Sequence, residues 1–77
     1  MIPNDALINV LRTELDYHYK GQTDRVLLYK KRGSIKRVEV RRVSMHDEQA
    51  VRILLRQAGM PAEQIEHFIN AYRANQH

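Results

Sequence analysis

The 77-residue sequence contains no cysteine and no tryptophan, and it has only three glycines and two prolines. The absence of cysteine excludes a disulfide framework and a thiolate metal site, which are common supports of very small domains. Each glycine falls at an expected turn or helix end, so none is left to form a glycine-rich phosphate loop. We therefore expect no bound cofactor and no metal.

Long hydrophobic runs are also missing. Residues 1–5 lack the basic region of a signal peptide, and no uninterrupted apolar stretch follows them. The sequence therefore predicts no leader and no membrane span, and hence a cytoplasmic protein. Hydrophobic residues still make up 43% of the chain, which is close to ordinary globular proteins and predicts one folded domain over residues 1–77.

Signatures of catalysis are weak. Ser44, His46 and Asp47 are the residue types of a hydrolytic triad, but they are neighbours at an expected helix start, where capping explains Ser44 and Asp47. The four histidines are His18, His46, His67 and His77. No two of them are four residues apart, so no local metal site is formed. We predict that the protein is not an enzyme, unless two copies build a site between them.

The spacing of apolar residues predicts three helices and one β-hairpin. A helix over about 5–20 is expected because apolar residues recur every three or four positions and Gly21 follows. Further helices are expected over about 46–58 and 61–73, with Gly59 between them. Two runs rich in β-branched residues, separated by residues 32–34, predict a hairpin over about 25–43. The expected fold is α+β, in the order α-β-β-α-α, with a two-stranded antiparallel hairpin packed on three helices.

Two registers of this hairpin remain open. If Lys30 pairs with Ile35, the apolar face consists of Leu27, Tyr29, Val38 and Val40. In a register one residue different, it consists of Val26, Leu28, Val38 and Val40. In either case the edges of a two-stranded sheet must be covered by the helices or met by another chain. Because so short a chain also has a small core, a homodimer is one expected assembly.

The net charge of +4 is concentrated in the middle of the chain. Residues 20–43 carry nine basic and two acidic side chains, a local charge of +7, whereas residues 1–19 carry −2 and residues 44–77 carry −1. Clustered cations attract polyanions by releasing condensed counterions, and arginine can grip phosphate with two hydrogen bonds. The candidate binding residues are Lys30, Lys31, Arg32, Lys36, Arg37, Arg41 and Arg42.

This basic hairpin makes a non-enzymatic binding module the main functional hypothesis, with nucleic acid as the expected partner. Tyr29 is the only aromatic residue of the hairpin, so contacts to phosphate are favoured over stacking on bases. The alternative is a small regulator, inhibitor or adaptor that binds an acidic protein partner through the same surface.

Residues 52–65, read as a helix, a glycine stop and the start of a second helix, resemble the helix pair that follows the wing in MerR-type regulators. A hairpin precedes them here, as the wing does in that family. The helix-turn-helix that comes before the wing has no counterpart in this chain, which offers a single helix there. The resemblance therefore implies a helical corner around Gly59.

Overall fold

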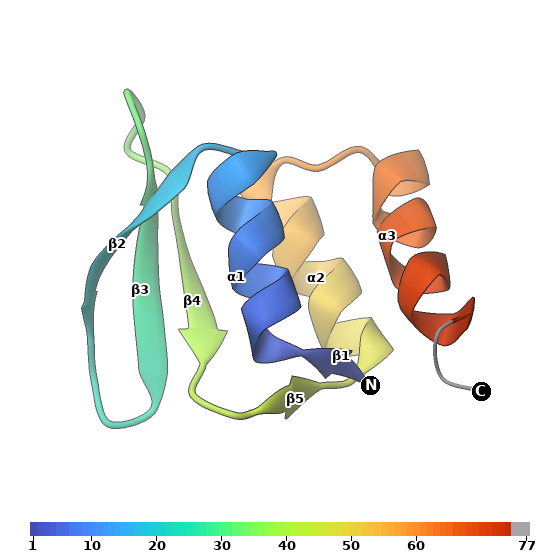
Figure 1. Cartoon of the computed structure of the whole chain (residues 1–77). Coiled ribbons are helices and arrows are strands. Elements are labelled where there is room, and N and C mark those ends of the chain that lie inside the picture. The colour runs from blue at the N-terminus through green and yellow to red at the C-terminus, as the bar shows by residue number, and fades with distance from the viewer. Residues whose placement is uncertain (75–77) are drawn as a thin grey trace.

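In the computed structural model, which describes residues 1–74, the chain forms an α+β fold of three helices and antiparallel strands, as the sequence predicts (Figure 1). Strands β2, β3 and β4 make one sheet in that order, and the two-residue strands β1 and β5 pair separately. The elements are β1 Ile2–Pro3, α1 Asn4–Thr13, β2 Tyr17–Gln22, β3 Val26–Lys31, β4 Arg37–Arg41, β5 Met45–His46, α2 Glu48–Ala58 and α3 Ala62–Ala74.

The first helix is shorter than its apolar spacing predicts. It ends at Thr13 instead of continuing to residue 20, and β2 begins at Tyr17. Asp16, between them, has a φ of 61°, a left-handed conformation that redirects the chain and that aspartate tolerates better than most residues. The following Tyr-His-Tyr sequence favours an extended strand. The prediction of a two-stranded hairpin was therefore incomplete, because β2 adds a third strand beside β3.

The sequence predicts that Gly21 ends the first helix, but Gly21 lies within β2. The pairing of β2 with β3 shifts by one residue between Tyr19 and Gly21, which makes a β-bulge at Lys20. Gly21 has a φ of 149°, which favours glycine at this irregular point.

The pairing of β3 with β4 settles which face of the hairpin is apolar. Leu27 lies opposite Val40 and Tyr29 opposite Val38, so these four residues share a face, as in the first of the two registers. Lys30 pairs with Arg37 and not with Ile35, a difference of two positions. Because side chains alternate with a period of two, this shift changes the partners but keeps the face.

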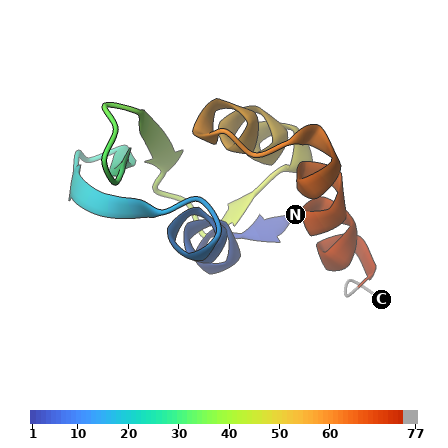
Figure 2. The same ribbon diagram turned by 90° about the horizontal axis from the view of Figure 1, so that it is seen from above.

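The apolar face of the sheet packs on α1 and α2, and α3 lies on the far side of these helices from the sheet (Figure 2). Tyr29, Val38 and Val40 are buried on this face. Tyr17 joins the layers, since its buried hydroxyl donates a hydrogen bond of 2.9 Å to the carbonyl of Ala58 at the end of α2. The remaining core residues are Ile2, Leu7, Val10, Leu11, Leu15, Val51, Leu55, Met60, Ile65 and Ile69.

The start and end of α2 follow from two residues. Asp47 is its N-cap and accepts a hydrogen bond of 2.9 Å from the amide of Ala50, whereas Ser44, expected to share this role, contributes its carbonyl to the amide of Asn4. Gly59 ends the helix with a φ of 101°. The helical corner expected at Gly59 is thus present.

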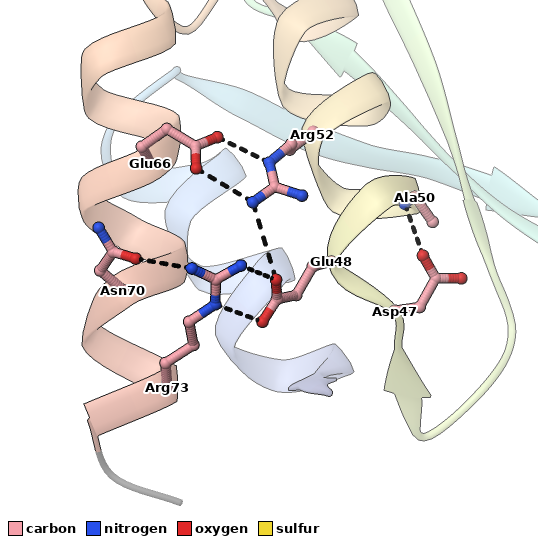
Figure 3. Close-up of polar contacts among 7 residues, drawn as sticks. All are labelled: Asp47, Glu48, Ala50, Arg52, Glu66, Asn70 and Arg73. Atoms are coloured by element: carbon pink, nitrogen blue, oxygen red, sulfur yellow. Dashed lines mark hydrogen bonds and ion pairs between the residues drawn. The ribbon is translucent and has the colours of Figure 1, made fainter.

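Ion pairs join α2 to α3 (Figure 3). Arg52 donates two hydrogen bonds to Glu66, of 2.7 and 3.0 Å, and lies 3.7 Å from Glu48 on its own helix. Arg73 makes a two-pronged contact with Glu48 and a further hydrogen bond to Asn70. The hydrogen bond from Arg73 lowers the pKa of Glu48, and that from Arg52 lowers the pKa of Glu66. Arg52 and Arg73 are therefore neutralised locally.

Candidate nucleic-acid interface

The sheet has a second face, turned away from the helices, which we call the outer face. On β3 and β4 its members alternate with the buried Tyr29, Val38 and Val40. On β2 it includes His18, which pairs with Lys30, and Lys20 at the bulge, which lines the same hollow as Lys30. The outer face consists of His18, Lys20, Val26, Leu28, Lys30, Arg37, Glu39 and Arg41.

The outer face is hollowed where β2, β3 and β4 lie side by side. The hollow has a volume of about 690 Å³, and three of its lining residues are the cations Lys20, Lys30 and Arg37. Leu28 contributes an apolar floor, and Ile35, whose side chain is 91% exposed, lies at one end. A concave surface bordered by cations can follow a rounded, negatively charged ligand more closely than a flat one.

Its cations differ from Arg52 and Arg73 of the helix pair in having no ion-pair partner in the described chain. Within residues 1–74, Lys20, Lys30, Arg37 and Arg41 form no ion pair. The single acidic residue of the outer face is Glu39, which lies between Arg37 and Arg41 on β4. The face therefore presents four cations against one carboxylate, and their ammonium and guanidinium groups remain available to a ligand.

The seven basic residues predicted as a site do not gather on one surface. Lys30, Arg37 and Arg41 lie on the outer face. Lys31 belongs to the inner face, where its ammonium lies 5.8 Å from the centre of the Tyr17 ring, a cation–π contact. Lys36 also turns inward, with its Nζ 3.6 Å from the position that a Cβ on Gly59 would take. There it faces the negative end of the α2 dipole.

The remaining two predicted residues lie at opposite ends of the sheet. Arg32, in the loop between β3 and β4, lies 3.3 Å from the carboxylate of Asp16. Arg42, just after β4, donates a hydrogen bond of 3.0 Å to the carbonyl of Thr23 in the turn between β2 and β3. Both side chains thus have structural contacts at the sheet ends.

The structure adds residues that the sequence analysis placed elsewhere. Lys20 joins the outer face, and Tyr19 exposes 52% of its surface on the other side of β2. The sequence predicts that Tyr19 and Lys20 lie in the last turn of the first helix, so their positions in the sheet were not anticipated. The signal that could have revealed them is the run Tyr17-His18-Tyr19, whose β propensity competes with the helical spacing before it.

The residues of the Ser44-His46-Asp47 cluster have structural contacts among residues 1–74. His46 is buried and forms a hydrogen bond of 2.8 Å between its Nε2 and Asn4 Oδ1, which links β5 to the start of α1. Burial lowers the pKa of His46, and Arg41 lowers it further while Asp47 acts in the opposite direction. No three histidine or acidic side chains of the described chain are grouped to hold a metal ion, and His77 lies outside the described residues.

Residues 1–74 contain no helix with the length and apolar character needed to traverse a lipid bilayer. No protein-family model, curated protein or solved structure matches the chain.

Proposed function

We propose that the protein is a nucleic-acid-binding module whose outer face contacts the phosphate backbone. The observation that supports this most is the unpaired state of Lys20, Lys30, Arg37 and Arg41 on one face, where the first three line the hollow. Cations that already have carboxylate partners gain little from a phosphate, whereas unpaired ones release counterions from the nucleic acid when they bind. The outer face carries no aromatic ring apart from that of His18, so the expected contact is with charge and not with base sequence.

The strands also match a backbone ligand in size. Strands of five or six residues, such as β3 and β4, extend about 15 to 20 Å. Arg37 and Arg41 lie at the two ends of β4, and Lys30 is the cross-strand neighbour of Arg37. A single strand of nucleic acid carries one phosphate about every 3.4 Å of duplex axis, so several phosphates fit along this face.

The test is a salt titration of binding to a labelled DNA or RNA duplex of about two helical turns. We expect affinity to fall linearly with the logarithm of salt concentration, and the slope to shrink by about 0.7 to 0.9 for each phosphate contact removed. Arg37→Gln should lose about one contact, and the double variant Lys30→Gln/Arg37→Gln about two. The matched control is Arg56→Gln, which removes an exposed arginine of α2 that forms no ion pair among residues 1–74.

Equal losses from Arg37→Gln and Arg56→Gln would show that only total charge matters, and the proposed face would be wrong. A double variant that binds as tightly as the parent would also refute it. Poly-glutamate in place of the duplex tests the alternative of an acidic protein partner. If poly-glutamate binds with the same dependence on Lys30 and Arg37 and the duplex does not bind, the outer face serves a protein and not a nucleic acid.

A further inference from the structure

A second hollow lies between the last turn of α1 and the beginning of β2, on the helix side of the sheet. Its volume is about 420 Å³, which is within the range of small-ligand sites. It differs from the hollow of the outer face because most of its walls come from α1, β2 and the loop after β3, and Tyr29 is the one residue among 1–74 that lines both. The lining residues that matter here are Arg12, Tyr19, Tyr29 and Arg32.

Tyr19 gives this hollow an exposed aromatic ring held in a fixed orientation. The side chain is 52% exposed although two contacts restrain it. Its ring packs edge to face against Tyr29, with centroids 5.9 Å apart and planes at 73°, and its hydroxyl donates a hydrogen bond of 3.1 Å to Gln22 Oε1. An exposed tyrosine that has already lost its rotational freedom is a platform on which a planar ligand can stack at low entropic cost.

Two arginines border the same hollow, one with an ion-pair partner and one without. Arg32 is held 3.3 Å from Asp16, whereas Arg12 forms no ion pair with any residue in the described part of the chain. The charge of Arg12 reaches the hollow, because it opposes the increase in the pKa of Tyr29 that burial causes. Arg12 can therefore bind a phosphate next to a ring stacked on Tyr19. The hollow thus combines an exposed aromatic platform, Tyr19, with an arginine that has no ion-pair partner among the described residues, Arg12.

We propose that this hollow binds one unpaired nucleobase, stacked on Tyr19, with its phosphate held by Arg12. The inference rests on the proposed function, since the outer face supplies the affinity for the strand to which this base belongs. Bases inside a duplex are stacked on each other and cannot reach Tyr19, so the hollow gives the protein a preference for single-stranded or locally open nucleic acid.

The experiment compares a labelled single-stranded oligonucleotide with the duplex of the same sequence, using the parent, Tyr19→Ala, Tyr19→Phe and Arg12→Gln. Tyr19→Ala should weaken binding of the single strand by about 5- to 150-fold, the range for the stacking of one base. Tyr19→Phe keeps the ring and should retain single-strand affinity. Arg12→Gln should weaken single-strand binding more than duplex binding. Duplex binding should be unchanged in both Tyr19 variants, which also shows that they are folded.

The outcomes separate this inference from the proposed function. If neither nucleic acid binds the parent, the proposed function fails. If both bind and Tyr19→Ala affects them equally, the stacking site is refuted while the outer face stands. A photoreactive uridine in the single strand should cross-link to Tyr19, and cross-linking elsewhere with no adduct at Tyr19 would contradict the site. Adenosine monophosphate is the last probe: if the mononucleotide binds in a Tyr19-dependent manner and the single strand does not bind, the ligand is a free nucleotide and the proposed strand contact is wrong.

Discussion

The sheet and the helix pair contain the same type of cation in opposite situations. Arg52 and Arg73, on α2 and α3, each contact a carboxylate with two prongs (Figure 3). Arg37 and Arg41, on β4, have no ion-pair partner among residues 1–74 and lie around one glutamate. The first pair joins two helices, whereas the second leaves its charge exposed to solvent.

This difference shows why the number of basic residues in a region does not tell how many of them can bind a ligand. An arginine that already holds a carboxylate must lose that contact before it can bind phosphate, so its contribution to a ligand is small. The middle of the chain has nine cations and only two carboxylates, so most of its cations cannot find an acidic partner nearby. The charge imbalance of that segment is therefore what leaves the outer face unpaired.

The largest expected effect concerns whether the sheet and the helix pair unfold together. Leu55 is fully buried on α2 in the core that the sheet and helices share. Leu55→Ala should cost about 2 to 5 kcal/mol of the free energy of unfolding, through lost burial and a cavity. Far-UV circular dichroism follows mainly the helices, and near-UV circular dichroism follows the packing of the four tyrosines, three of which lie in the sheet. Both should report one transition at the same denaturant concentration, and two separate transitions would contradict a shared core.

Tyr17 provides a smaller test of the connection between the regions. Tyr17→Phe keeps the buried ring but removes the hydroxyl that donates to the carbonyl of Ala58. Leaving that carbonyl without its partner should cost about 1 to 3 kcal/mol of unfolding free energy, measured by denaturant titration. Tyr72→Phe, on α3, is the matched control. It should be close to neutral, because the Tyr72 hydroxyl forms no hydrogen bond within the described residues. Equal effects of the two variants would argue against the role given to the Tyr17 hydroxyl.

The sequence predicted the three helices and the central hairpin because their signals are local. Gly59 marks a helix end by its left-handed conformation, and a mixture of Val, Leu and Tyr marks β3. The strand β2 could not be found in the same way. Leu7, Leu11 and Leu15 continue a helical spacing up to the point where Asp16 turns the chain. What decides the outcome is the hairpin that β2 forms with β3, whose signal is hidden by the helical spacing that runs into it.

The candidate site was predicted only in part, for a related reason. Local charge is visible in a sequence, so the basic segment was found at once. The face to which each cation belongs depends on register, and Lys31 and Lys36 turned out to lie on the inner face, away from Lys30 and Arg37. An outer face can be derived only after the register and the third strand are known.

Glu48 of the helix pair and Glu39 of the outer face allow the paired and unpaired arginines to be tested side by side. Glu48→Gln removes the carboxylate shared by Arg52 and Arg73, so it should lower the melting temperature and leave duplex binding unchanged. Glu39→Gln removes the single negative charge of the outer face. It should strengthen duplex binding about 2- to 5-fold, as expected for roughly 0.5 to 1 kcal/mol of repulsion at a solvated surface, with little change in stability. Calorimetry and binding titrations of both variants measure the two effects, and reversed outcomes would show that the comparison of the two regions is wrong.

The smallest expected effect concerns His46, which lies outside both charged regions. Burial lowers its pKa below the ordinary value of 6.5, so the unfolded chain binds a proton more readily than the folded one. Stability is then complete above pH 6.5 and declines as the pH falls from there through the folded-state pKa. Glu48 and Glu66, whose pKa values are lowered from 4.5, contribute little between pH 7 and 5, because most of their effect is lost only below pH 4.5.

Melting temperatures measured between pH 7 and 5 should therefore decrease in the parent protein. His46→Asn should abolish most of that dependence, whereas His67→Asn, which changes an exposed histidine of α3, should leave it in place. The protonated His46 can still donate to Asn4 through Nε2, so the loss comes from burying the charge near Arg41 and not from a broken hydrogen bond. Weakening that contact with Asn4→Ala should therefore lower stability at every pH and preserve the slope. A flat profile in the parent would mean that protonation of the buried His46 ring does not lower stability, contrary to this prediction.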